Sequence, residues 1–202
     1  MPARRAPRRG VPLSSIRLLV LDVDGVMTDG RLTFGPQGQP YQTFHVRDGH
    51  GIRAVLAAGI AVAVISGRRS EAVQRRCEEL GVAHLSQGIA DKAAELARLS
   101  AGLGFSAEQC ACLGDDTPDV PLLSQAGLAI AVADAHPSAL AVAHRRTRAR
   151  GGMGAVREVC DWLLAARAAA AAAATAQQRA GRTRRAGNSR RAENRRRAGR
   201  PP

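Results

Sequence analysis

Hydrophobic and polar positions follow two alternating patterns through the first five-sixths of the chain. Short runs of consecutive apolar residues predict strands that are buried on both faces. They lie at residues 17–21, 60–66, 83–88, 110–116 and 128–134. Between them, apolar residues at helical spacing, often ending at glycine, predict helices. These lie at residues 48–59, 70–81, 90–104 and 154–167.

This alternation of strands and helices predicts a doubly wound α/β fold, with one parallel sheet covered by helices on both faces. In such folds, ligands bind at the carboxyl ends of the strands. Asp22, Ser66 and Asp115 each stand at the end of a predicted strand. We therefore expect three separate segments to meet at one edge of the sheet.

A different pattern separates the first strand from the first helix. Leu32, Phe34, Tyr41 and Phe44 flank a turn sequence of glycine and proline, which predicts a small β-hairpin flap over residues 32–44. A two-stranded hairpin is marginal alone and needs partners to bury its apolar face. Only about 20 residues separate Asp24 from the next predicted helix, which excludes a cap domain there.

The net charge of +13 belongs to the ends of the chain. Four arginines precede residue 10, and eleven, against one glutamate, follow from Arg167 onward, which leaves residues 10–166 at −1. We expect a basic, disordered arm over residues 1–13, a folded domain over residues 14–167, and a disordered Ala- and Arg-rich tail over residues 168–202, whose alanines can extend the last helix. The tail supports salt-sensitive adhesion to anions, but not specific nucleic-acid recognition.

Further sequence features bear on location. There is no run of about 18 apolar residues and no apolar signal core after the basic N-terminus, so we expect a cytoplasmic protein with no membrane span. The four cysteines show no paired metal-ligand spacing, which indicates reduced thiols. They are Cys77, Cys110, Cys112 and Cys160.

Acidic residues dominate the predicted strand ends. Asp22 and Asp24 follow the first strand, and Asp115, Asp116 and Asp119 follow a later one. Carboxylates brought together repel one another unless a cation lies among them, and an oxygen-rich site of this kind suits Mg²⁺. One carboxylate could then attack phosphorus while a neighbour transfers protons. The alternative is structural, because aspartates are also common in turns and at helix N-termini.

Ser66 and Lys92 extend this hypothesis to a phosphate group. Ser66 could donate a hydrogen bond to a phosphoryl oxygen, although it could equally cap a helix. Lys92 is the only lysine in the chain and opens a predicted helix, where its charge opposes the helix dipole. A phosphate partner would explain that position, whereas a solvated surface lysine is the alternative.

These motifs resemble a known family. "DVDGV", "ISGR", the lone lysine and "GDDTPD" are similar to the four motifs of the haloacid dehalogenase-type phosphatases. Together with "FHVRDGHGI", "VADAHP" and "GGMGAVREVCDWLL", they resemble 3-deoxy-D-manno-octulosonate 8-phosphate (KDO 8-phosphate) phosphatases over about residues 17–167. The resemblance implies a haloacid dehalogenase-like Rossmannoid subunit without a cap, a homotetramer with interfacial active sites, Mg²⁺, and release of KDO and phosphate in lipopolysaccharide precursor biosynthesis.

The resemblance also implies roles for the acidic and phosphate-binding residues. Asp22 corresponds to the nucleophile and a metal ligand, and Asp24 to the general acid/base, with its backbone carbonyl on the metal. Asp115 corresponds to the third protein ligand. Ser66 and Lys92 correspond to the phosphoryl-binding pair.

A second set of residues corresponds to the substrate-binding positions of that family. Arginine suits a sugar-acid phosphate because it binds carboxylates and phosphates bidentately, although a solvated helix-face charge is the alternative for each arginine. The set comprises His45, Val46, Arg47, Asp48, Gly49, Arg53, Arg68, Arg76 and Asp116, of which Asp116 also supports the water shell of the metal.

The chain departs from the family pattern at Met153, which replaces a usual arginine, and at His45, which replaces a usual asparagine. These differences leave open a phosphatase for a nonulosonate (sialic-acid-type) 9-phosphate. A non-catalytic, phosphatase-like oligomerisation domain is a further alternative, which the presence of Asp22, Asp24, Lys92 and Asp115 disfavours.

Overall fold

The computed structural model describes residues 11–38 and 40–198, with side chains through residue 177. The chain divides into two compact units, Met1–Leu164 and Ala165–Pro202. The first unit contains a six-stranded parallel sheet in the order β5-β4-β1-β6-β7-β8. The strands are β1 (Leu18–Leu21), β4 (Ala61–Ser66), β5 (His84–Gln87), β6 (Cys110–Gly114), β7 (Leu128–Ala131) and β8 (Arg145–Arg146).

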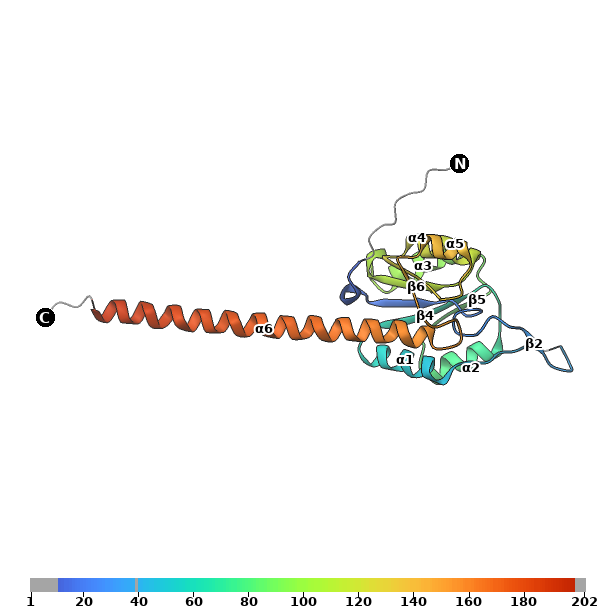
Figure 1. Ribbon diagram of the computed structural model, residues 1–202, viewed down its shortest axis with the longest axis horizontal. Coiled ribbons are helices and arrows are strands. Elements are labelled where there is room, and N and C mark those ends of the chain that lie inside the picture. The colour runs from blue at the N-terminus through green and yellow to red at the C-terminus, as the bar shows by residue number, and fades with distance from the viewer. Residues whose placement is uncertain (1–10, 39, 199–202) are drawn as a thin grey trace, which may run out of the picture. The chain divides into compact units, whose positions relative to one another are not determined.

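Helices cover both faces of this sheet (Figure 1). One face carries α1 (Val46–Ala57), α2 (Glu71–Leu80) and the first turns of α6 (Ala155–Ala198), and the other carries α3 (Lys92–Gly102), α4 (Val120–Gln125) and α5 (Pro137–Val142). All residues of β1, β6 and β7 are buried, so the central strands lie in the core. The predicted doubly wound α/β fold is confirmed.

Register brings the ends of the central strands to one edge. Leu21, the last residue of β1, pairs with Val64 of β4 and with Leu113 of β6. The chain order runs outward from β1 through β4 and β5 on one side and from β6 through β7 and β8 on the other. Such a reversal of strand order opens a crevice at the carboxyl ends of the strands.

The predicted helix 70–81 shows how local sequence sets element boundaries. Ser70 is the N-cap of α2, where its side chain accepts a hydrogen bond from the Val73 N–H. Gly81 ends the helix in the left-handed conformation, with φ of 77°. By contrast, α4, α5 and β8 were not predicted from the sequence. Six-residue helices and a two-residue strand are too short to display a hydrophobic period.

The hairpin flap consists of β2 (Thr33–Phe34) and β3 (Pro40–Tyr41), which pair antiparallel. Leu32, Phe34 and Tyr41 are 44%, 60% and 53% exposed. Phe44 instead packs against the core. The flap therefore presents apolar surface to the outside of the chain, while its base is anchored to the domain.

The expected basic arm and the expected Ala- and Arg-rich tail at the two ends of the chain stay predictions. Residues 1–10 of the expected arm lie outside the described residues, whereas the Val11 N–H donates to the Gly127 carbonyl. The structure continues α6 through the alanine run to Ala198. Alanine has the highest helix propensity and arginine is also a good helix former, which favours this continuation.

Hydropathy and cysteine state bear on the remaining expectations. The segment Ala155–Gln177 of α6 is long and apolar enough to cross a membrane by length and composition, unlike the sequence expectation. Its first turns bury Val156, Val159 and Leu163 in the domain core. The expected free thiols are confirmed, and all four cysteines are buried.

Candidate active site

Carboxylates and one ammonium group meet at the carboxyl edge of the sheet. Asp22 directly follows β1, Asp115 directly follows β6, Ser66 ends β4, and Lys92 begins α3. They line a cleft of about 210 Å³, whose wall comprises Asp22, Asp24, Ser66, Gly67, Lys92, Asp115, Asp116, Pro118 and Asp119. The convergence of three strand ends predicted from sequence is confirmed.

Lys92 bridges two carboxylates at the floor of this cleft. Its Nζ donates to Asp22 Oδ1 and to Asp119 Oδ1, each at 2.6 Å, and all three side chains are at most 7% exposed. Asp91 accepts the backbone N–H groups of Ala93 and Ala94 as the N-cap of α3, which makes Lys92 the first residue of the helix. A local cap therefore positions a charge that reaches residues distant in sequence.

Asp119 is held by the loop that follows β6. Its Oδ2 accepts the backbone N–H of Asp115 at 2.9 Å, while its Oδ1 receives the Lys92 ammonium. Both oxygens of this buried carboxylate are therefore satisfied. Asp119 orients Lys92 and shapes the loop that presents Asp115.

Burial and crowding shift the protonation equilibria of this cluster. Burial raises the pKa of Asp22 to about 6, with a further rise from Asp119, while Lys92 acts in the opposite direction. Burial likewise raises the pKa of Asp115 to about 8, and the charges of Asp22, Asp119 and Asp116 add to this effect. These shifts are the signature of carboxylates brought together with too little positive charge among them.

The donor set fits a hard divalent cation. Ligand oxygens of Asp22, Asp115 and Asp119 lie within 4.8 Å of one another. Carboxylate oxygens are the ligands that Mg²⁺ prefers, and a cation among them would relieve their mutual repulsion. Gly25 makes room for this arrangement, since a Cβ there would lie 2.1 Å from Asp115 Oδ2 and its φ is +90°.

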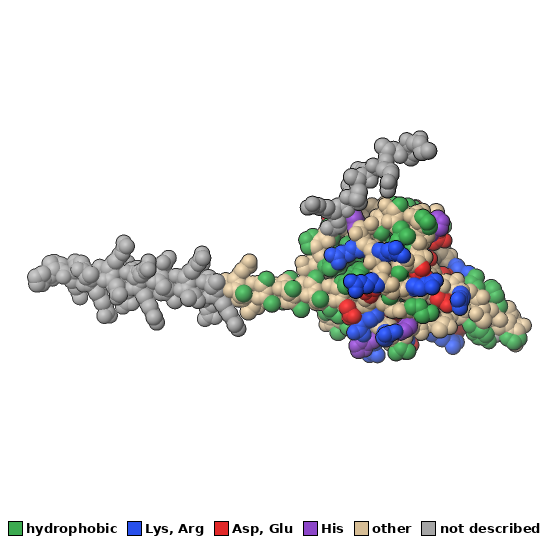
Figure 2. Space-filling view, viewed as in Figure 1, with side chains coloured by type: hydrophobic (Ala, Val, Ile, Leu, Met, Phe, Trp, Pro, Cys, Tyr) green, Lys and Arg blue, Asp and Glu red, His purple; other side chains and the backbone are tan. Residues whose placement is uncertain are grey.

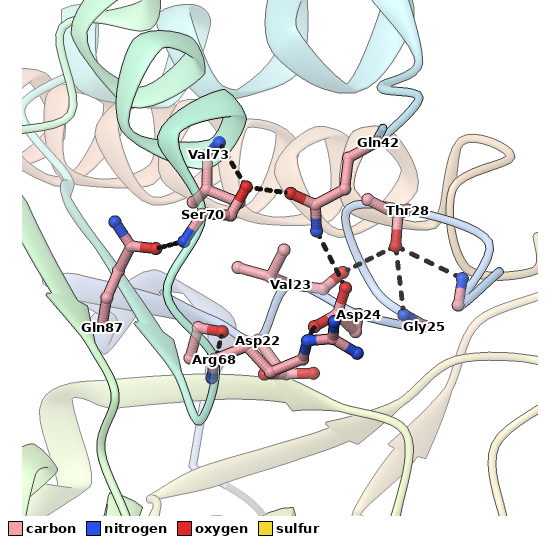
Figure 3. Close-up of polar contacts among 12 residues, drawn as sticks. Asp22, Val23, Asp24, Gly25, Thr28, Gln42, Arg68, Ser70, Val73 and Gln87 are labelled. Atoms are coloured by element: carbon pink, nitrogen blue, oxygen red, sulfur yellow. Dashed lines mark hydrogen bonds and ion pairs between the residues drawn. The ribbon is translucent and has the colours of Figure 1, made fainter. Parts of the chain in front are cut away.

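Asp24 lies beside the cluster in a network of its own (Figure 3). Its Oδ1 accepts a hydrogen bond from Gln42 Nε2 at 2.9 Å, and its Oδ2 lies 4.0 Å from Arg68 Nε. Ser66 Oγ accepts the Arg68 backbone N–H at 3.2 Å. Asp24 is therefore held at the rim of the cleft by residues from the hairpin and from the segment after β4.

Several predicted substrate residues lie elsewhere in this chain. His45 is the N-cap of α1, and Val46, 80% exposed, begins that helix. Asp48 is buried and accepts the N–H groups of Gly154 and Arg157 at the start of α6. The expected substrate loop is thus the first turn of a helix that is fastened to α6.

The arginines predicted to bind substrate lie at different places on the chain. Arg76 pairs with Glu79 at 2.7 Å beside Gly49, where a Cβ would lie 2.2 Å from the guanidinium. Arg53 is exposed on α1. Among the described residues, Arg68 is the one predicted arginine that lies near Asp24, with Nε 4.0 Å from Asp24 Oδ2. The roles of the others stay predictions.

Arg47 lines a separate cavity of about 940 Å³, here called the arginine cavity. Basic side chains gather on the face of the body seen in Figure 2. The cavity lining comprises Arg47, Arg145, Arg146, Arg148, Ala149, Met153, Gly154, Arg157, Glu158, Asp161 and Trp162. Met153, one of the two departures from the family pattern, therefore lines this cavity and not the carboxylate cleft.

The sequence analysis named Asp119 among the acidic residues without assigning it a role, and it did not name Gln42. Asp119 stood in the quoted "GDDTPD" turn, and its spacing from Asp115 was a usable signal for a third carboxylate in the cleft. Gln42 carried no sequence signal, because its contact with Asp24 spans 18 residues and depends on the path of the hairpin.

The fold and the carboxylate cleft define a haloacid dehalogenase-like hydrolase, and the sequence profile of that class matches residues 84–154. The chain is 50% identical over 153 residues to the 3-deoxy-D-manno-octulosonate 8-phosphate phosphatase of Yersinia pestis, covering 76% of this chain and 82% of the relative. It is 48% identical over 152 residues to that of Escherichia coli K12, covering 75% and 81%. The chain belongs to the 3-deoxy-D-manno-octulosonate 8-phosphate phosphatase family.

Solved structures of proteins from this family have a similar fold. The Yersinia pestis phosphatase superposes with a TM-score of 0.76 at 49% identity, covering 77% of this chain and 84% of the other. The Moraxella catarrhalis phosphatase, solved with magnesium, phosphate and KDO, gives a TM-score of 0.75 at 40% identity, covering 77% and 89%.

Proposed function

We propose that this chain is a Mg²⁺-dependent phosphatase that hydrolyses KDO 8-phosphate to KDO and inorganic phosphate, in the cytoplasm, during lipopolysaccharide precursor biosynthesis. The observation that carries the proposal is the cleft in which Asp22, Asp24, Ser66 and Lys92 converge. The activity named for the Yersinia pestis and Escherichia coli relatives supports it.

In the first half of the proposed reaction, an Asp22 oxygen attacks phosphorus and the bond from phosphorus to the sugar oxygen breaks. Asp24 gives its proton to that leaving oxygen, which releases KDO with a neutral hydroxyl group and leaves an aspartyl-phosphate. Lys92, held 2.6 Å from Asp22, contributes positive charge beside the transferring group. Ser66 donates a hydrogen bond to a phosphoryl oxygen.

In the second half, Asp24 takes a proton from water as the water oxygen attacks phosphorus. The bond from phosphorus to Asp22 breaks, its electrons return to the carboxylate, and phosphate leaves. Asp22 and Asp115, with the Asp24 backbone carbonyl, would hold Mg²⁺, and Asp119 lies in the same oxygen cluster. When bound, the ion supplies charge neutralisation for the phosphoryl oxygens.

We further propose a homotetramer whose active sites are completed by neighbouring subunits, with no specific nucleic acid or membrane as partner. The exposed apolar side chains of the flap support this proposal, as do the predicted substrate residues that lie outside the chain's own cleft. A subunit without a cap also leaves an aspartyl-phosphate open to solvent, and a neighbour would shield it.

The tetramer is tested by replacing Leu32 and Phe34 with serine, which removes apolar surface without touching the anchored Phe44. We expect smaller species in sedimentation velocity and a parallel loss of activity. Arg31→Ser, at a neighbouring exposed position, is the matched control and should stay assembled. A fully active monomer would contradict the proposal of interfacial active sites.

The reaction is tested by phosphate release from KDO 8-phosphate and from a nonulosonate 9-phosphate, each with Mg²⁺ and with EDTA. We expect Mg²⁺-dependent release with a higher kcat/KM for KDO 8-phosphate. A preference for the nonulosonate ester would instead support the alternative left open by Met153 and His45. The absence of release from both esters would favour a non-catalytic role.

A further inference from the structure

We propose that Gln42 is a positioning residue that holds the Asp24 carboxyl group in one orientation for proton transfer to the leaving oxygen. The inference rests on the proposed role of Asp24 as general acid. Gln42 directly follows β3 of the flap, so its side chain connects the hairpin to the segment after β1 (Figure 3).

Hydrogen-bond direction determines how the Gln42 amide is turned. Ser70 Oγ accepts the Val73 N–H as the cap of α2, and its own hydroxyl donates to Gln42 Oε1 at 2.5 Å. With Oε1 directed at Ser70, Nε2 faces Asp24 Oδ1 and donates to it at 2.9 Å. The reversed amide would set two acceptor oxygens against each other at Asp24 and leave the serine hydroxyl without its acceptor.

Ser70 is itself held in place. Its backbone N–H donates to Gln87 Oε1 at 2.7 Å, which ties the start of α2 to the end of β5. The chain of contacts thus runs from the sheet through Ser70 and Gln42 to Asp24. Each donor in it has one acceptor, so rotation of the Gln42 amide would break contacts at both of its ends.

This network distinguishes the two oxygens of Asp24. Oδ1 accepts a hydrogen bond from Gln42, whereas Oδ2 accepts none from the described residues and lies 4.0 Å from Arg68 Nε. Oδ2 is therefore the oxygen left to carry and transfer a proton. The Asp24 side chain is 26% exposed, so without Gln42 it would sample rotamers in which Oδ2 turns away from the cleft.

A purely structural role for Gln42, in fastening the flap, predicts a different pattern of defects. Loss of proton transfer to the leaving group harms an alkyl phosphate, whose leaving oxygen needs protonation, far more than p-nitrophenyl phosphate, whose phenolate leaves unprotonated. Loss of the flap would harm both substrates. The ratio of kcat/KM values separates these cases, because kcat/KM reports steps only through departure of the leaving group and omits the later role of Asp24 as base.

The experiment compares Gln42→Met and Gln42→Glu with wild type in the full-length protein with Mg²⁺. Met keeps the length of the side chain without an amide, and Glu keeps an acceptor for Ser70 without the donor to Asp24. We expect both to lower kcat/KM for KDO 8-phosphate about 10- to 100-fold and that for p-nitrophenyl phosphate less than about threefold. Gln74→Met, whose amide donates to Glu78 on the surface of α2, is the control and should match wild type.

Equal losses on both esters, unchanged kinetics, or full activity of Gln42→Glu would each overturn the inference. Thermal melting and sedimentation of every variant check folding and assembly. If wild type releases no phosphate from KDO 8-phosphate, the proposed function fails. If wild type is active and the variants show no selective loss, the positioning role alone fails.

Discussion

The carboxylate cleft and the arginine cavity are both rich in charged side chains, but the paired charges are buried in the cleft and most charges in the cavity are exposed to solvent. In the cleft, Lys92 and two carboxylates are buried and meet at 2.6 Å. In the cavity, Arg145, Arg146 and Arg148 are exposed to solvent. Arg146 Nε donates to the Ala133 carbonyl, and Arg145 lies over the Trp162 ring at 5.6 Å.

The carboxylates with raised pKa values line the smaller of the two spaces. The arginine cavity is about 940 Å³ and the cleft about 210 Å³, yet the raised pKa values of Asp22 and Asp115 belong to the cleft. Water screens exposed charges, while buried like charges keep a strong mutual repulsion that a cation or a proton must relieve. The comparison teaches that concentrated, desolvated charge locates this site better than cavity size does.

The largest effect is expected from Asp22→Asn, which tests whether Asp22 of the cleft is the nucleophile. An amide cannot attack phosphorus as a carboxylate does, so we expect kcat to fall by at least about 10³-fold while the fold and assembly persist. Phosphate release and sedimentation measure the two properties. Turnover within tenfold of wild type would exclude Asp22 as the nucleophile.

Lys92→Met probes the buried charge balance. Removing the ammonium leaves Asp22 and Asp119 facing each other without compensation, so we expect the free energy of unfolding to fall by about 3–5 kcal/mol, with activity lost as well. Urea denaturation measures this change. Arg98→Met is the matched control, because Arg98 pairs with Glu95 on the exposed face of the same helix, and it should change stability little.

The pKa of Asp115, raised by burial to about 8 from 3.8, predicts a pH-dependent stability in EDTA. The folded state binds this proton more tightly than the unfolded state, so the stabilisation is complete below pH 3.8 and is lost as pH rises through about 8. The melting temperature of Asp115→Asn minus that of wild type should therefore rise by about 4 °C from pH 5 to pH 9.

The same melting-temperature comparison is repeated with Mg²⁺ in place of EDTA. Since the cation binds ionised carboxylates, Mg²⁺ should raise the melting temperature of wild type more at pH 9 than at pH 5, and raise that of Asp115→Asn less. A melting-temperature difference between the two proteins that is independent of pH would contradict the raised pKa.

The smallest effects on catalysis are expected from the solvated basic regions. Arg148→Gln in the arginine cavity should leave kcat/KM within about twofold of wild type, because its exposed charge is screened by solvent and Arg148 is not among the predicted substrate residues. Truncation after Arg167 should likewise preserve phosphate release while abolishing salt-sensitive retention on an anionic resin. A large loss of activity in either variant would show that a basic region reaches an active site.

The local sequence pattern was enough to predict several features of this protein. Runs of apolar residues predicted the central strands, and the positions of Asp22, Ser66 and Asp115 at strand ends followed from the rule that parallel strands present their carboxyl ends together. The caps of α2 were visible as Ser70 and Gly81. Short-range periodicity and capping determine such elements, so one sequence is enough to locate them.

Tertiary structure alone decided which of these residues touch. Lys92 meets Asp119 across 27 positions and Asp22 across 70, and Asp48 caps α6 from 109 positions before Arg157. The single contact between Gln42 and Asp24 depends on where the hairpin returns to the domain. Such pairings arise from the packing of whole helices and loops on the sheet, where a shift of a few ångströms makes or breaks a hydrogen bond, and no local period encodes them.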